Sequence, residues 1–129
     1  MEDQPVILVA DDNDEDRKII ADALREAGFS VMQAIDAGSA RKVANEYEVS
    51  FAFIDHFMTP YDGVEFARFM AMDGKDIPMY LVTHEDDSDL LTECLRLGFL
   101  GLMKKPVDPQ RVVSIVRHIL SRLSRNQAD

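Results

Sequence analysis

One stretch decides the fold: Val6-Ile7-Leu8-Val9-Ala10-Asp11-Asp12. Its apolar part, Val6 to Val9, is short, mostly β-branched and not interrupted by polar residues, which is typical of a strand buried on both faces of a parallel sheet. A second run of this kind, Phe51-Ala52-Phe53-Ile54, also ends in a carboxylate, Asp55. The two runs therefore indicate an α/β protein whose parallel strands carry acids at their carboxyl ends.

The rest of the chain repeats this alternation of strand and helix. Apolar runs predict strands over Val6–Val9, Ser30–Ala34, Phe51–Ile54, Met79–Val82 and Gly101–Met103. Apolar residues at helical spacing predict helices over Glu15–Ala27, Ala37–Tyr47, Val64–Met72 and Ser88–Leu97, and a fifth that starts between Pro106 and Pro109 and carries apolar residues to Leu123. Such alternation predicts a parallel sheet covered by helices on both faces. Because crossovers are right-handed, we expect a flavodoxin-like (βα)5 doubly wound sheet with strand order 2-1-3-4-5.

Composition limits the class of protein and its partners. The chain has 129 residues, of which 47% are hydrophobic and 29% charged, so we expect one globular domain over 1–129, with its core over about 5–123 and a frayed tail over 124–129. The net charge of −10 argues against nucleic acids and anionic membranes as partners of this domain. Cys94 is the only cysteine, so no disulfide can form within the chain. We find no signal-peptide pattern and no apolar run near the ~20 residues of a membrane span, and we expect a cytoplasmic location.

The acids at the strand ends form the first candidate site. If their strands are parallel neighbours, Asp11, Asp12 and Asp55 crowd the edge of the sheet where ligands bind in this fold. Three close carboxylates repel one another unless a proton or a cation relieves them, and their oxygens suit Mg²⁺. A plainer interpretation is that Asp11 and Asp12 start a solvated acidic run at a helix N-terminus, and that Asp55 is an ordinary strand-end residue.

Residues after the fourth and fifth strands are expected to join these acids. Thr83 follows the fourth strand directly, and Lys104-Lys105-Pro106 follows the fifth. Successive strand residues point to opposite sides, so only one of the two lysines can reach the carboxylates. Pro106 restricts the residue before it to extended geometry, and we therefore expect Lys105 in the site and Lys104 in solvent. Thr83 could also cap the fourth helix.

Together these residues resemble the receiver domain of two-component response regulators, over nearly the whole chain from Val6 to Leu123. The matching pieces each follow a strand or its loop, and they are Asp11-Asp12, Asp55, a loop of the type D-x-x-M-x-x-x-D-G closed by Asp62-Gly63, Thr83, and Lys105-Pro106. Each piece alone is weak evidence, whereas the full set in this order is specific.

The resemblance implies a phosphoaccepting signalling switch rather than an enzyme. Asp55 would accept a phosphoryl group from a histidine kinase or a phosphotransfer protein. Lys105 would pair with Asp55 before transfer and with a phosphoryl oxygen afterwards, and the Thr83 hydroxyl would donate a hydrogen bond to the phosphoryl group. Movement of Thr83 would change the surface of the fourth helix, fifth strand and fifth helix, through which a homodimer could form.

The resemblance also implies a Mg²⁺ site. Asp12, Asp55 and the backbone carbonyl of Phe57 would hold the ion, and Asp11 would act through water. The Phe57 side chain offers no polar group to position an attacking water, so we expect at most slow self-dephosphorylation.

Some positions depart from the family pattern. His84 stands where the residue after the switch threonine is usually small, Leu102 where an aromatic is usual, and Thr59 where proline is usual. His84 and Leu102 support an alternative function, a pseudo-receiver that binds a protein partner and is not phosphorylated. His56 and His84 lack metal-ligand spacing, and we expect them to be neighbours of the site rather than ligands.

Two other classes share part of the pattern. Metal-dependent phosphatases with an aspartate nucleophile usually carry a second aspartate two residues on, where this chain has Phe57. A flavin-binding flavodoxin has the same sheet order, but here the first strand is followed by acids rather than by a Ser/Thr/Gly loop for a phosphate. We expect neither.

Overall fold

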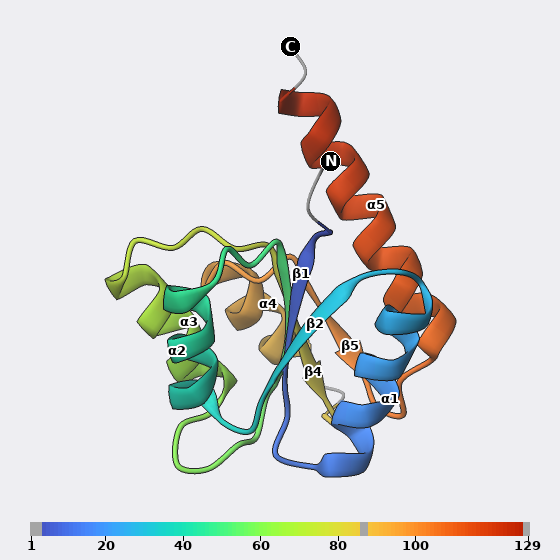
Figure 1. Cartoon of the computed structure of the whole chain (residues 1–129). Coiled ribbons are helices and arrows are strands. Elements are labelled where there is room, and N and C mark those ends of the chain that lie inside the picture. Colours follow the sequence, from blue (N-terminus) through green and yellow to red (C-terminus); the bar gives the residue numbers. More distant parts are fainter. Residues whose placement is uncertain (1–3, 86–87, 128–129) are drawn as a thin grey trace.

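Strand and helix alternate along the whole described chain (Figure 1). The structure is a computed structural model that describes residues 4–85 and 88–127, with side chains for 4–85 and 88–124. The strands are β1 (Val6–Ala10), β2 (Ser30–Ala34), β3 (Phe51–Asp55), β4 (Met79–Thr83) and β5 (Gly101–Lys104). The helices are α1 (Asp14–Glu26), α2 (Ala37–Glu46), α3 (Gly63–Met72), α4 (Ser88–Arg96) and α5 (Pro109–Gln127).

The five strands form one parallel sheet in the order β2-β1-β3-β4-β5, as predicted. The register brings the strand ends level with one another: Ala10 pairs with Ile54, Asp55 with Val82, and Thr83 with Lys104. Four strands run one residue beyond their predicted ends, because the residues that follow the apolar runs still pair with the next strand. Side chains at these four ends therefore meet at one edge of the sheet.

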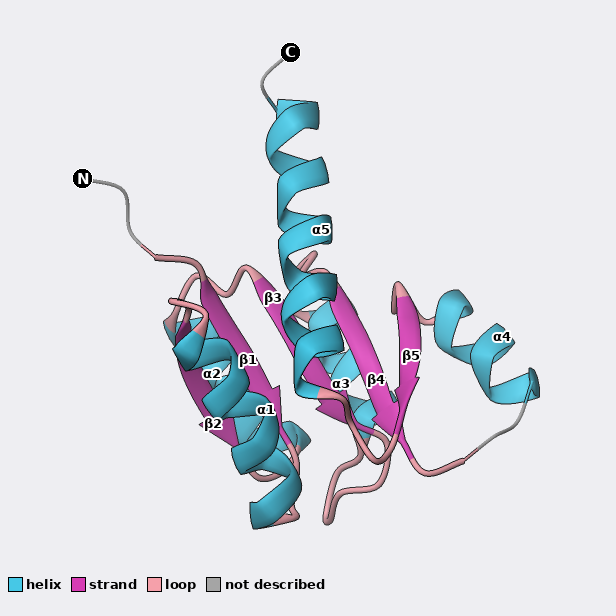
Figure 2. Ribbon diagram, turned by 90° about the vertical axis from the view of Figure 1, so that its right-hand side faces the viewer, coloured by secondary structure: helices cyan, strands magenta, loops and turns pink. Residues whose placement is uncertain are grey.

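The two faces of the sheet are filled by residues of different size. Helices α1 and α5 lie on one face of the sheet and α2 and α3 on the other (Figure 2). Ile7, Val9, Phe51 and Phe53 pack with residues of α1 and α5, whereas the intervening strand residues pack with residues of α2, α3 and α4. The α1/α5 face is built from rings and branched chains. The opposite face contains seven buried alanines: Ala10, Ala34, Ala37, Ala40, Ala44, Ala52 and Ala67.

Short polar residues and glycines set the helix ends. The side chain of Asn13 accepts a hydrogen bond from the Asp16 backbone N–H at the start of α1, and Asp62 caps α3 in the same way. Gly28 and Gly98, which the sequence placed just after helices, have φ angles of 96° and 100°. Only glycine adopts this left-handed backbone without a steric penalty, so both helices stop there.

The C-terminal helix is longer than predicted. We expected the core to end near Leu123 and residues 124–129 to be frayed, whereas α5 continues to Gln127 and residues 128–129 lie outside the described part. The apolar spacing stops at Leu123, but an established helix extends by one backbone hydrogen bond per residue. Among the described helices, none is both long enough and apolar enough to span a bilayer.

Candidate functional site

The carboxyl ends of β1 and β3 bring the predicted acids together. Asp11 directly follows β1 and Asp55 is the last residue of β3, and both side chains are buried, while Asp12 is exposed. A carboxylate oxygen from each of these three residues lies within 4.8 Å of the other two. Ligands of this kind, two buried and one facing solvent, fit a hard divalent cation such as Mg²⁺, with Asp12 on the side from which an ion can enter.

Lys105 is the lysine that reaches these acids, as the alternation of strand residues predicted. Its side chain is 4% exposed, and its Nζ donates to Asp11 Oδ2 at 3.0 Å and lies 3.1 Å from Asp55 Oδ1. The backbone N–H of Lys105 donates to the carbonyl of Thr83, which fixes where the side chain leaves β5. Lys104, the last residue of β5, is exposed.

Burial and charge shift the pKa values of both partners. Burial raises the pKa of Asp55 to about 7, with a further rise from the charge of Asp11, and the nearby Lys105 ammonium offsets only part of this. Burial alone would lower the pKa of Lys105, but hydrogen bonds to Asp16 and Asp11 and the charges of Asp11 and Asp55 outweigh it, so the pKa is raised. Lys105 is therefore charged at neutral pH, while the pKa of Asp55 lies well above that of a free carboxyl group.

The loop after β1 holds Asp11 in place. Its Oδ1 accepts a hydrogen bond from the Asn13 backbone N–H at 2.9 Å. Its backbone carbonyl accepts from the Arg17 guanidinium at 2.8 Å, and Arg17 is itself anchored by Asp14 and Gln33. Asp11 is thus fixed at Oδ1 and at its carbonyl oxygen, which leaves Oδ2 for Lys105 in the site.

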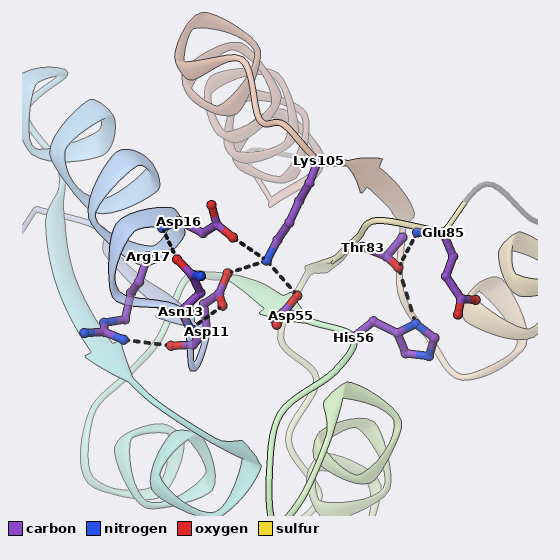
Figure 3. A network of polar contacts seen from close by, with 9 residues as sticks. All are labelled: Asp11, Asn13, Asp16, Arg17, Asp55, His56, Thr83, Glu85 and Lys105. Atoms are coloured by element: carbon purple, nitrogen blue, oxygen red, sulfur yellow. Dashed lines mark hydrogen bonds and ion pairs between the residues drawn. The ribbon is translucent and has the colours of Figure 1, made fainter.

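Thr83 ends β4 beside the acids, but its hydroxyl is engaged elsewhere. Its Oγ1 accepts from the Glu85 backbone N–H at 3.1 Å and lies 3.4 Å from Nδ1 of His56 (Figure 3). The suggestion that Thr83 caps α4 is wrong, because the helix begins five residues later at Ser88. His56 is a neighbour of the site, as predicted, and contacts Thr83.

The loop between β3 and α3 explains the D-x-x-M-x-x-x-D-G pattern. Met58 is buried in the core and Asp62 accepts from the Glu65 N–H as the α3 cap. The Gly63 N–H donates to the His56 carbonyl at 3.1 Å. A Cβ on Gly63 would lie 2.7 Å from the Asp55 carbonyl oxygen, so glycine is required for this close approach.

The residues that the sequence marks as departures from the usual pattern have different surroundings. His84 is exposed, and Leu102 is half-buried against the core beside Leu81, its partner in the sheet register. Leu102 therefore acts as a packing residue here. The Phe57 side chain is exposed, and its ring stacks on His56 at 4.1 Å between centroids.

Asp16 is the site residue that sequence reasoning missed. Its Oδ2 accepts a hydrogen bond from Lys105 Nζ at 2.9 Å, although it appeared to be one more acid of a solvated helix start. A signal was present, because Asp16 continues the stripe of buried Ile20 and Leu24 toward the sheet edge at intervals of four residues. A charged residue on a buried helical stripe needs a partner.

Comparison with known families identifies the same kind of domain. Residues 7–117 match the response regulator receiver domain family. The two-component response regulator ORR5 of Oryza sativa subsp. japonica is 29% identical over 120 residues, covering 90% of this chain and 89% of its own length. The phosphate regulon transcriptional regulatory protein PhoB of Pseudomonas aeruginosa is 28% identical over 118 residues, which are 90% of this chain and 52% of that protein.

Solved structures show the same fold. The receiver domain of the Francisella response regulator 1452 superposes with a TM-score of 0.87 at 23% identity, covering 92% of this chain and 98% of that one. A CheY-like receiver domain from Methanospirillum hungatei JF-1 gives a TM-score of 0.87 at 18% identity, covering 96% and 99% of the two chains.

Proposed function

The chain belongs to the response regulator receiver domain family, and we propose that it is a signalling switch that accepts a phosphoryl group on Asp55. One observation carries this proposal: the Asp55 carboxylate is buried at the end of β3, 3.1 Å from the ammonium of Lys105 and within 4.8 Å of the carboxylates of Asp11 and Asp12. A single nucleophile thus has fixed positive charge on one side and a candidate cation site on the other.

The transfer itself needs position and charge neutralisation more than covalent chemistry. A carboxylate oxygen of Asp55 forms a bond to phosphorus while the bond from phosphorus to the donor's histidine nitrogen breaks, and that electron pair stays on the nitrogen. Lys105 exchanges its contact with the Asp55 carboxylate for one with a phosphoryl oxygen. Asp12, Asp55 and the backbone carbonyl of Phe57 would hold Mg²⁺, with Asp11 acting through water, and the bound ion would supply the remaining charge neutralisation.

Thr83 is the residue that passes the change on. In the unphosphorylated protein its hydroxyl faces His56 and Glu85, and we propose that it turns to donate to the phosphoryl group. Because the Lys105 N–H is bonded to the Thr83 carbonyl, such a movement affects β5 directly. The surface of α4, β5 and α5 would change, and exposed Leu91, Leu95 and Leu100 nearby suit a protein partner or a second copy.

The donor is a histidine kinase or a phosphotransfer protein, and the aspartyl phosphate is lost slowly. The exposed Phe57 ring brings no hydrogen-bonding group to orient a water for attack on the phosphorus. A half-life of seconds for the phosphorylated protein after removal of the donor would refute the slow loss.

The direct test is incubation with acetyl phosphate and Mg²⁺, followed by intact mass spectrometry of the parent and of Asp55→Asn. We expect one added phosphoryl group on the parent and none on the variant. The alternative is a pseudo-receiver that binds its partner without phosphorylation, which the engaged Thr83 hydroxyl favours. It predicts no added mass on a parent that is folded and binds Mg²⁺, and that outcome would refute the proposed switch.

A further inference from the structure

The Lys105 ammonium is held by three carboxylates that come from three different elements. Its Nζ lies 3.0 Å from Asp11 Oδ2, 2.9 Å from Asp16 Oδ2 and 3.1 Å from Asp55 Oδ1 (Figure 3). An ammonium group has three N–H donors and accepts nothing. Two of these donors are hydrogen-bonded, to Asp11 and to Asp16, while Asp55 is held by an ion pair. The lysine therefore has at most one N–H left for another acceptor.

Asp16 differs from the other two carboxylates in position. It lies in the first turn of α1, where its backbone N–H donates to the Asn13 side chain at 2.9 Å, and its side chain is 31% exposed. Asp11 and Asp55 belong to the acids that could share a cation, whereas Asp16 is outside that group. The contact between Asp16 and Lys105 is therefore not part of the arrangement that would hold Mg²⁺.

Phosphorylation changes the demands on the lysine. Once Asp55 carries a phosphoryl group, its carboxylate charge is gone and several phosphoryl oxygens take its place as acceptors. The ion pair with Asp55 is then lost, and Lys105 has one N–H for the phosphoryl group, while Asp11 and Asp16 keep the other two. The helix that carries Asp16 is packed through Ile20 and Leu24, so this acceptor stays in place.

We propose that Asp16 is a positioning residue that holds Lys105 on the α1 side of the site and competes with the phosphoryl group for the lysine's protons. This inference rests on the proposed function of Asp55. Two opposite effects follow from it. The additional negative charge near the acids favours Mg²⁺ binding, whereas the competition for Lys105 slows phosphorylation once Mg²⁺ is saturating.

The chain contains a matched control for the charge. Glu15 is the neighbour of Asp16 in the same helical turn and is exposed. Glu15→Gln and Asp16→Asn therefore remove the same charge from the same turn, but only the second removes an acceptor of Lys105. Asp16→Glu keeps the charge and tests whether a longer carboxylate can restore the contact.

The test measures two quantities on the parent and these three variants. The first is the affinity for Mg²⁺ alone, by titration calorimetry. The second is the initial rate of phosphorylation by acetyl phosphate at saturating Mg²⁺, by intact mass. We expect Asp16→Asn to weaken Mg²⁺ binding about fivefold and to raise the phosphorylation rate about threefold, as the loss of one nearby charge and one hydrogen bond suggests. Glu15→Gln should change each by less than about twofold, and Asp16→Glu should lie nearer the parent than Asp16→Asn.

The outcomes separate this inference from the proposed function. A fall in both quantities for Asp16→Asn means that the residue is only structural, and equal effects of Asp16→Asn and Glu15→Gln mean that only its charge matters. Either result overturns the competition while leaving a phosphorylated parent. A parent that takes no phosphoryl group refutes the function of Asp55 and the competition together.

Discussion

Gly63 lies against the backbone of Asp55 so closely that a methyl group on it would sit 2.7 Å from the Asp55 carbonyl oxygen and 2.8 Å from the Leu81 side chain. The start of α3 therefore packs directly against the backbone at the end of β3. The loop between them, which carries Phe57, has its ends tied by the hydrogen bond from the Gly63 N–H to the His56 carbonyl.

We therefore expect Gly63→Ala to destabilise the protein by about 2 kcal/mol, because backbone atoms of β3 or α3 must move. It should also lower the rate of phosphorylation of Asp55. Gly38→Ala, in the first turn of α2, is the matched control, since its Cβ would lie at an ordinary 3.5 Å from Asp36 Oδ1. Alanine there should stabilise by about 0.5–1 kcal/mol. Urea unfolding measures both, and equal midpoints for the two variants would contradict the close approach.

The raised pKa of Asp55 makes stability depend on pH in a defined window. The unfolded carboxyl loses its proton near pH 4, whereas burial and the charge of Asp11 keep the folded pKa at about 7. The folded state therefore binds more protons between these values, and this group makes the protein less stable as the pH rises from about 4 to about 7. Asp55→Asn removes the effect.

Unfolding measurements in EDTA test this pH dependence of stability. The stability of Asp55→Asn relative to the parent should increase across this window, by about 2 kcal/mol after allowance for solvent screening. Mg²⁺ should stabilise the parent above pH 7 more than the variant. A difference between the two proteins that stays constant from pH 4 to pH 7 would mean that Asp55 is ionised throughout.

Loss of Lys105 should leave the acids without their ammonium. We expect Lys105→Met to lower the free energy of unfolding by about 3 kcal/mol in EDTA, because buried carboxylates lose their partner, and we expect Mg²⁺ to restore part of it. Lys104→Met, at an exposed neighbour, should change stability by less than about 0.5 kcal/mol. Urea unfolding with and without Mg²⁺ measures this, and similar losses in the two variants would argue against a special role for Lys105.

Asp73 should contribute stability with the opposite pH dependence. The Arg41 guanidinium donates to both of its oxygens and Asn45 donates to one, and these hydrogen bonds lower the pKa of Asp73 to about 2. Its contribution is therefore present above pH 4 and lost as the pH falls through about 2. Asp73→Asn should be less stable than the parent at pH 7 and approach it at acidic pH. Asp76→Asn, at an exposed site nearby, serves as the control, and a pH-independent difference for Asp73→Asn would contradict the prediction.

Sequence patterns predicted the sheet order, and the strand ends to within one residue, because both follow from local rules. Apolar runs, the turn residues after helices and right-handed crossovers leave few topologies. The choice of Lys105 over Lys104 followed from alternation along β5 and from Pro106. These features depend on neighbours in the chain, so a single sequence contains them.

Features that depend on contacts between elements were harder to predict. The periodicity of α1 indicates that Asp16 needs a partner, but it does not indicate that the partner is Lys105. That contact depends on the height at which α1 lies over the sheet edge. The partners of the Thr83 hydroxyl, His56 and Glu85, come from two separate loops. The predicted end of α5 was too early because the prediction followed the apolar residues, which stop at Leu123. The backbone hydrogen bonds continue the helix to Gln127.

The unequal filling of the two faces has a consequence for how this sequence can vary. On the alanine-rich face, the small side chains of Ala40 and Ala44 let α2 lie close to β1 and β2, so enlarging either would push the helix away from the sheet. On the other face, Phe51 and Phe53 fill the space with rings, so truncation there leaves cavities. We therefore expect the two faces to reject opposite kinds of substitution. Larger residues should be rejected on the alanine-rich face, and smaller residues on the α1/α5 face.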